Sequence, residues 1–229
     1  MSTRGAHARA GLLLDLDGTL AQTEHLHHAA FNAVLAAHGR SIDHATFVRH
    51  VSGRSNDDIT AFLFPGEDVD TRKRIAADKE RSFRELASAG VAATPGAAAL
   101  LRWARERGVA TGLVTNAPRE NADLMVEVLG LGDAFDIEVS AAELARSKPH
   151  PDPYLAAVKA LELDAHRTVA IEDSATGIAA AHAAGLAVVA MATGATAASI
   201  AATGTALVIA DMTDARLYAF LQARLGVPS

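Results

Sequence analysis

Residues 12–20 read Leu-Leu-Leu-Asp-Leu-Asp-Gly-Thr-Leu, and they are the most informative segment of the chain. Its apolar run predicts a buried strand that delivers two carboxylates, Asp15 and Asp17, to the end of the strand. Gly18 and Thr19 then predict a turn. Carboxylates are costly to bury without a cation or hydrogen-bond donors. Two of them at the mouth of a core strand therefore indicate a divalent metal and chemistry, at the edge where open α/β sheets bind ligands.

Three other interpretations of this stretch are a calcium-binding loop, a capped turn and a chance match. A calcium loop also uses D-x-D-G, but it needs further oxygen ligands and a downstream Glu, whereas Leu20 and Ala21 follow here. An Asx-turn at Asp17 would explain one carboxylate and not the other. The third interpretation is a chance match, which the rest of the chain has to decide.

The composition fits a chain with a large apolar core. The 229 residues can form one large domain or two smaller ones, and 50% of them are hydrophobic. The net charge of −6 argues against nucleic acid as a partner. The absence of cysteine excludes disulfides and thiolate sites and fits the cytosol. Since no apolar stretch reaches the ~20 residues of a membrane span and Met1–Ala10 has no signal-peptide core, we expect a cytoplasmic protein with no membrane partner.

Strand-like and helix-like segments alternate along most of the chain. Besides the run before Asp15, the segments that predict strands are Val109–Thr115, Phe135–Val139, Thr168–Ile171, Leu186–Ala192 and Ala206–Ala210. The segments that predict helices are Gly96–Gly108, Arg119–Leu129, Pro153–Leu161, Thr176–Ala184 and Thr213–Ser229. This alternation predicts a Rossmann-like, doubly wound α/β fold whose parallel sheet is covered on both faces.

One segment interrupts the alternation. From Glu24 to Ala93 the pattern is helical, more polar and broken by glycines, and it contains no convincing strand. We therefore predict an α-helical cap domain at residues 23–93, inserted into a core domain made of residues 1–22 and 94–229. Because the insertion begins beside the two aspartates, it is placed to act as a lid over them.

Further polar residues follow the predicted strands or precede a helix. The sets are Thr115-Asn116, Lys148-Pro149 and Glu172-Asp173-Ser174. Each set has an ordinary explanation on its own, as a turn or helix cap, a surface lysine, and a second helix cap. The carboxyl ends of parallel strands, however, lie along one edge of the sheet. Taken together and in this order, the sets predict one site.

The side chains of this predicted site suit phosphoryl transfer. A carboxylate such as Asp15 can attack phosphorus and form an aspartyl-phosphate. Mg²⁺ prefers carboxylate and phosphate oxygens, and Asp15 and Asp173 could supply the protein's share. Lys148 and Thr115 could neutralise and hydrogen-bond the phosphoryl oxygens. Asp17 could protonate the leaving oxygen and later activate water.

The motifs together resemble those of the haloacid dehalogenase superfamily, over about residues 11–193. The resemblance implies that Asp15 is the nucleophile and Asp17 the general acid/base. It implies that Thr115 and Lys148 act on the phosphoryl group, and we assign Gly18 and Asn116 to the phosphate-binding set. The implied cofactor is Mg²⁺, held by Asp15, the carbonyl of Asp17 and Asp173, with Glu172 close by.

Within the superfamily, the chain is similar to the group of β-phosphoglucomutase and of sugar-phosphate or phosphoglycolate phosphatases, which carry a helical cap. His27 matches a cap histidine that assists proton handling in the mutases, although a solvated, histidine-rich helix face also explains it. Arg54 is a candidate substrate contact, or a surface arginine. Asn56 stands where the mutase cap has an arginine, and the stretch after Thr115 lacks the serine-rich mutase loop. Both differences favour a phosphatase.

We therefore expect a Mg²⁺-dependent phosphatase for a small phosphorylated metabolite, with sugar phosphates as the first class, and a monomer or weak dimer. The first alternative is a β-phosphoglucomutase-type phosphomutase, which would pass the phosphoryl group from Asp15 to a second sugar hydroxyl. A dehalogenase is disfavoured because that branch needs neither Mg²⁺ nor a second aspartate. A non-catalytic binding module is disfavoured because no motif residue is missing.

Overall fold

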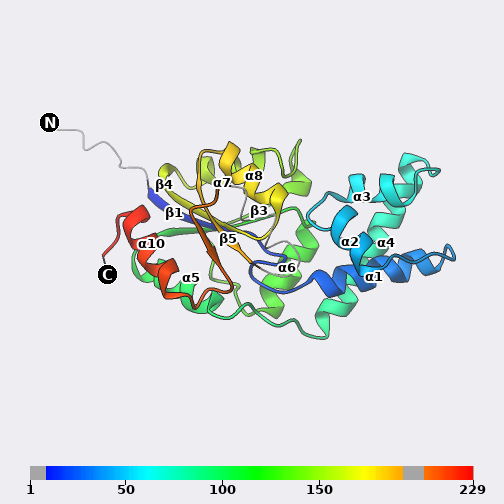
Figure 1. Ribbon diagram of the computed structural model, residues 1–229, viewed down its shortest axis with the longest axis horizontal. Coiled ribbons are helices and arrows are strands. Elements are labelled where there is room, and N and C mark those ends of the chain that lie inside the picture. Colours follow the sequence, from blue (N-terminus) through cyan, green and yellow to red (C-terminus); the bar gives the residue numbers. More distant parts are fainter. Residues whose placement is uncertain (1–8, 193–203, 229) are drawn as a thin grey trace.

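The central sheet is parallel throughout the part of the chain that the computed structural model describes, residues 9–192 and 204–228 (Figure 1). Its strand order is β3-β2-β1-β4-β5-β6. The strands are β1 (Arg9–Leu14), β2 (Ala110–Thr115), β3 (Ile137–Ser140), β4 (Leu163–Glu172), β5 (Ala187–Met191) and β6 (Leu207–Ile209). Leu14 of β1 pairs with Leu113 of β2 on one side and with Ile171 of β4 on the other. The strand that carries the first motif is therefore central.

Helices cover both faces of this sheet. One face carries α5 (Ala97–Glu106), α6 (Arg119–Val128) and α10 (Ala215–Leu225), and the other carries α7 (Asp152–Ala160) and α8 (Ala175–Ala183). Leu100, Met125 and Leu221 are buried in the apolar cluster of the first face, and Tyr154 and Ile178 in that of the second. The predicted α/β fold is confirmed. Residues 1–8 of the predicted core domain and Ser229 of its last helix lie outside the described residues.

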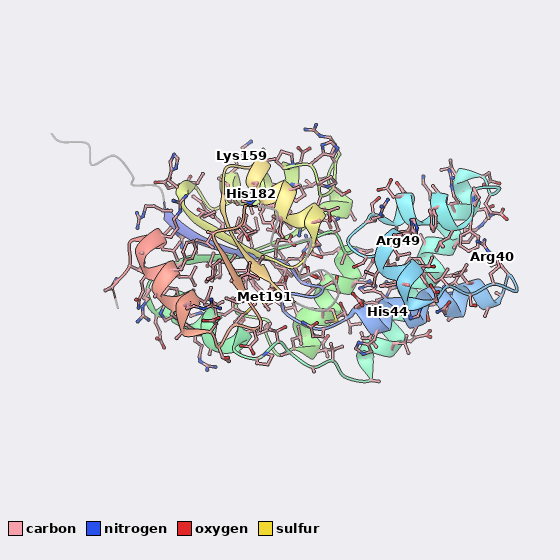
Figure 2. All side chains as sticks on the ribbon, in the orientation of Figure 1. Arg40, His44, Arg49, Lys159, His182 and Met191 are labelled. Atoms are coloured by element: carbon pink, nitrogen blue, oxygen red, sulfur yellow. The ribbon has the colours of Figure 1, made fainter. Side chains whose placement is uncertain are left out.

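A group of helices lies to one side of the sheet, at the right of Figure 1. Its members are α1 (Glu24–Ala36), α2 (His44–His50), α3 (Asn56–Leu63) and α4 (Val69–Ser88). They share an apolar cluster of their own that includes Phe31, Phe47 and Ile75, while Arg40 and Arg49, labelled in Figure 2, are exposed residues of this group. The helical insertion is thus present, and the exact domain limits, residues 23–93, stay a prediction.

Local sequence explains where these helices begin. The side chains of Asp43, Ser55 and Asp68 accept hydrogen bonds from the first free backbone N–H groups of α2, α3 and α4. None of the helices in the described ranges is long and apolar enough to cross a membrane.

Candidate active site

The chain turns sharply after β1. The backbone N–H of Asp15 still donates to the carbonyl of Ile171 at 3.1 Å, and Gly18 then adopts a φ of +83°. A Cβ at Gly18 would lie 2.0 Å from Oδ2 of Asp173. Only glycine fits this turn, because it tolerates the positive φ and leaves room for the carboxylate that follows β4. The turn thereby brings the first and last motifs together.

Three carboxylates meet at this edge of the sheet. Ligand oxygens of Asp15, Glu172 and Asp173 all lie within 4.8 Å of one another. Burial and the charge of Glu172 raise the pKa of Asp15 to about 8, against the attraction of Lys148. Burial and the charge of Asp15 likewise raise the pKa of Asp173. These hard oxygen donors fit a divalent cation, whose charge would offset their repulsion.

Lys148 is placed inside this acidic cluster. Its side chain is only 2% exposed, and its Nζ donates to Asp15 Oδ1 at 2.6 Å, Glu172 Oε1 at 2.5 Å and the carbonyl of Val114 at 2.7 Å. Burial alone would lower the pKa of Lys148, but the two carboxylates outweigh it and raise the pKa. The alternative of a surface lysine is therefore wrong.

Thr115 is the last residue of β2 and Asn116 follows it, and both line the same pocket as Asp15. Oγ1 of Thr115 accepts from the backbone N–H of Ala117 at 3.0 Å. Asn116 Oδ1 accepts from the backbone N–H of Lys148 at 3.1 Å, and its Nδ2 donates to the Lys148 carbonyl at 3.5 Å. Asn116 therefore braces the loop that carries Lys148, a contact that the phosphate-binding prediction did not include.

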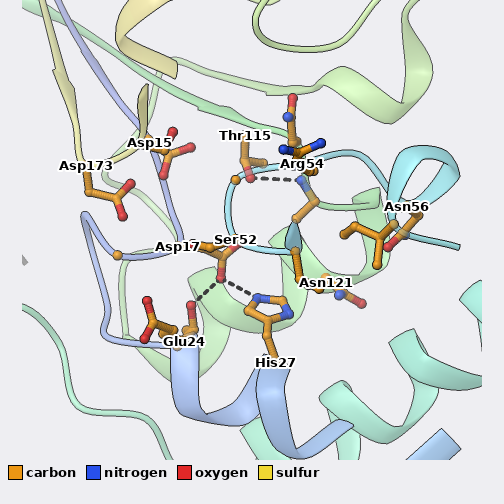
Figure 3. Close-up of a pocket in the computed structure, with 18 of the residues that line it drawn as sticks. Asp15, Asp17, Glu24, His27, Ser52, Arg54, Asn56, Thr115, Asn121 and Asp173 are labelled. Atoms are coloured by element: carbon orange, nitrogen blue, oxygen red, sulfur yellow. Dashed lines mark hydrogen bonds and ion pairs between the residues drawn. The ribbon is translucent and has the colours of Figure 1, made fainter. Parts of the chain in front are cut away.

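The carboxylate of Asp17 lies in a second group of side chains (Figure 3). Its Oδ1 accepts from Thr23 Oγ1 at 2.6 Å and lies 3.1 Å from His27 Nε2. The ring of His27 stacks on Phe83 at 4.1 Å, and its Nδ1 lies 2.9 Å from Lys79 Nζ. Burial would raise the pKa of Asp17, but the neighbouring histidine and the two hydrogen bonds outweigh it and lower the pKa.

This second group has two consequences for the sequence predictions. His27 faces the site rather than solvent, since its side chain is only 19% exposed, so the solvated-face alternative is wrong for this histidine. The carboxylate of Asp17 is engaged by Thr23 and His27, which is compatible with the predicted metal contact through its carbonyl.

Glu172 is fully buried behind the pocket. Besides Lys148, it accepts hydrogen bonds from the Tyr154 hydroxyl at 2.7 Å and from Ser174 Oγ at 3.2 Å. A Cβ at Gly177 would lie 2.0 Å from its carboxyl group. Sequence reasoning missed Tyr154 and Gly177, because a tyrosine and a glycine within apolar helical segments carry no local signal of this contact.

One pocket collects the two groups of side chains. Asp15, Asp17, Thr115, Lys148 and Asp173 line it from the sheet edge, and the cap helices and their loops line it from the opposite side. Helix α4 contributes Lys79 and Glu80, and helix α6 contributes Asn121. None of these three was predicted, since their pairing depends on how the cap packs on the core.

The loop after α2 lines the pocket. Thr176 Oγ1 of α8 donates to the carbonyl of Gly53 at 2.7 Å, which ties this loop to the core. Arg54, the next residue, lines the pocket and is exposed. Its guanidinium makes no hydrogen bond or ion pair with the other described residues. Arg54 thus lies at the pocket, and its contact with substrate stays a prediction.

A family model described as haloacid dehalogenase-like hydrolase matches residues 10–185. The chain belongs to the haloacid dehalogenase-like hydrolases. The match spans β1 to the end of α8 and therefore includes the four motifs and the helical insertion.

Known proteins resemble the chain over most of its length. Protein CbbY of Rhodobacter capsulatus is 34% identical over 191 residues, which are 78% of this chain and 83% of CbbY. Validoxylamine A 7'-phosphate phosphatase of Streptomyces hygroscopicus subsp. limoneus is 32% identical over 178 residues, which are 76% of this chain and 81% of the relative. The crystal structure of a CbbY variant from Rhodobacter sphaeroides with xylulose-(1,5)bisphosphate matches 90% of this chain and 96% of its own, with a TM-score of 0.82 and 26% identity.

Proposed function

We propose that the protein is a Mg²⁺-dependent phosphatase that hydrolyses small phosphorylated metabolites, with sugar phosphates as the first class. The observation that carries this proposal concerns Asp15 and Asp17, which are only two residues apart in sequence but whose carboxylates lie in different groups of side chains. Asp15 lies with Lys148 and Asp173, whereas the carboxylate of Asp17 lies with His27. Such a site offers a nucleophile and a proton donor on different sides of one phosphoryl group. Family membership and the phosphatase name of one relative support it.

In the proposed first step, a carboxylate oxygen of Asp15 attacks phosphorus and the bond from phosphorus to the ester oxygen breaks. The proton that the leaving oxygen needs comes from the Asp17–His27 pair, whose closest atoms are 3.1 Å apart. Lys148 offsets the negative charge of the phosphoryl oxygens, and the Thr115 hydroxyl donates a hydrogen bond to one of them. A bound Mg²⁺, held by Asp15, Asp173 and the carbonyl of Asp17, would supply further charge neutralisation.

In the proposed second step, Asp17 removes a proton from water, and the water oxygen attacks the phosphorus of the aspartyl-phosphate. The bond between phosphorus and the Asp15 oxygen breaks, inorganic phosphate leaves, and the carboxylate is restored. Glu172 does not line the pocket, and its four hydrogen bonds make it a positioning residue for Lys148 and Asp173. We also propose a cytoplasmic monomer or weak dimer without a nucleic-acid or membrane partner.

The test is phosphate release from a panel of sugar phosphates, phosphoglycolate and nucleotides, with and without Mg²⁺. We expect Mg²⁺-dependent release that the Asp15→Asn variant abolishes and that Asp17→Asn slows in both steps. Wild-type-like turnover by Asp15→Asn would contradict the mechanism. If none of the esters released phosphate, the proposed function would be wrong.

The panel also separates a phosphatase from a mutase. It includes β-glucose 1-phosphate with a coupled assay for glucose 6-phosphate. Free phosphate is the expected product, because Asn56 rather than an arginine faces the substrate side of the cap. Formation of glucose 6-phosphate without free phosphate would make the protein a phosphomutase.

A further inference from the structure

The two sides of the pocket differ in charge. Figure 3 shows Asp15 and Asp173 at one side and Asn56 and Asn121 across from them. The cap helices contribute Phe31, Phe47, Asn56, Ile59, Lys79 and Glu80 to the lining, and we call these six residues the distal wall. In the mechanism proposed above, the phosphoryl group binds at the near side. The leaving group of the ester therefore faces the distal wall.

The lysine of the distal wall is already paired. Lys79 is 3% exposed, and its Nζ lies 2.9 Å from Glu80 Oε1 and 2.9 Å from His27 Nδ1. The same ammonium lies over the rings of Phe31 and Phe83, at 4.9 and 5.5 Å from their centroids. The positive charge of Lys79 is therefore already compensated by protein groups in the absence of substrate.

Glu80 is held in place from three directions. Its Oε1 accepts from Lys79 and from Asn56 Nδ2 at 2.8 Å, and its Oε2 accepts from Asn121 Nδ2 at 2.5 Å. Burial would raise the pKa of Glu80, but the charges of Lys79 and His27 and the hydrogen bonds from Lys79 and Asn56 outweigh it and lower the pKa. The carboxylate is thus charged and only 6% exposed, and it cancels the one cation of the distal wall.

We propose that Glu80, by neutralising Lys79, makes the distal wall select uncharged leaving groups, so that the enzyme prefers phosphate monoesters with one phosphoryl group over bisphosphates. This inference rests on the proposed phosphatase function. A second phosphoryl group against the distal wall would lose water, meet the Glu80 carboxylate and find no free cation. A leaving group that carries hydroxyl groups fits better, because one N–H and the side-chain carbonyl oxygen of Asn56 can still form hydrogen bonds with it. Phe31 and Phe47 can pack against the apolar faces of such a leaving group.

Arg54 does not change this preference. Its guanidinium is unpaired among the described residues, but it lies exposed at the pocket mouth on the loop after α2. Attraction between an exposed arginine and a phosphate is screened by water and salt, so it is weak beside the cost of burying a dianion at the distal wall.

The test compares kcat/KM for matched substrates, fructose 1-phosphate with fructose 1,6-bisphosphate and glucose 1-phosphate with glucose 1,6-bisphosphate. For each pair that the wild type hydrolyses, we expect kcat/KM to be about tenfold or more higher for the monophosphate than for the bisphosphate. Repulsion between the Glu80 carboxylate and a second phosphoryl group can produce a difference of this size. Glu80→Gln frees the charge of Lys79 and should lower this ratio about tenfold. Glu85→Gln makes the same charge change on the exposed side of α4 and should leave the ratio unchanged.

A second variant guards against misfolding of Glu80→Gln. Asn56→Lys, at a partly exposed position, adds a second cation beside Glu80, so that the distal wall gains a net positive charge, and it should also raise bisphosphate turnover. A wild type that prefers bisphosphates would overturn the inference and leave the phosphatase function standing. So would an unchanged ratio in both variants. If none of the four esters released phosphate, both this inference and the proposed phosphatase function would be contradicted.

Discussion

The ammonium nitrogen of Lys148 lies 2.6 Å from Oδ1 of Asp15, although 133 positions separate the two residues in sequence. Each group is buried and each compensates the charge of the other. The contact joins the loop before α7 to the end of the central strand. Several measurable consequences depend on it or on the contacts around it.

Replacing Lys148 by methionine should leave Asp15 and Glu172 as uncompensated buried carboxylates. We expect the free energy of unfolding to fall by about 3 kcal/mol, in the range for breaking a buried ion pair. Turnover should fall at least about 100-fold, because the proposed phosphoryl contact is lost. Chemical denaturation and phosphate release measure these effects. Lys159→Met on the exposed side of α7 is the control, and equal stability of the two variants would contradict the expectation.

Gly177→Ala should destabilise the protein although alanine favours helices. The new Cβ would lie 2.0 Å from the Glu172 carboxyl group, which four donors hold in place. We expect a loss of about 1–3 kcal/mol, the usual cost of overpacking, against the gain of up to ~1 kcal/mol that helix propensity alone would give. Gly132→Ala, which meets no atom within 4 Å, should change little. A stabilised Gly177→Ala would show that Glu172 is free to move.

Thr176→Val should loosen the loop after α2. The variant keeps the shape of the side chain but loses the hydrogen bond to the Gly53 carbonyl. One such bond contributes about 1 kcal/mol, so the equilibrium ratio of the docked to the undocked loop should fall about fivefold. We expect the KM for a phosphate ester to rise more than kcat changes, and Thr176→Ser to behave like the wild type. If valine and serine give the same KM, the contact does not act on substrate binding.

Glu80 should make stability depend on pH in the acid range. Its pKa is lowered on folding, so its ion pair with Lys79 and its hydrogen bonds stabilise the protein fully above the ordinary value of 4.5. This stabilisation is lost as the pH falls through the lowered pKa. The difference in free energy of unfolding between wild type and Glu80→Gln should therefore be constant near neutral pH and shrink below pH 4.5. Urea denaturation at several pH values measures it, and a difference that grows toward acid would have the wrong sign.

Much of the fold and of the site edge could be predicted because both depend on local patterns. Short apolar runs alternate with helical segments, and parallel pairing brings Asp15, Thr115 and Asp173 to one edge. The sequence also identified Lys148 as a member of this set, and the structure places its ammonium between two carboxylates.

The cap contacts could not be predicted in the same way. Lys79 and Glu80 lie on an amphipathic helix in which charged residues normally face water. Their burial depends on the packing of α4 against α1 and α6, which joins Glu80 to Asn121 across 41 positions. Tyr154 was missed for a similar reason, since an apolar helical position does not reveal a hydroxyl directed at Glu172.

The central place of β1 also bears on how the chain folds. Leu14 pairs with Leu113 and with Ile171, so β1 needs partner strands that are synthesised much later than β1 itself. Until synthesis has passed Ile171, one edge of this strand has no neighbour and Asp15 has no complete set of charge partners. Contacts between such distant positions slow folding, because a long loop must close before they form. The segment that carries Asp15 and Asp17 therefore reaches its final surroundings only after β4 has been made.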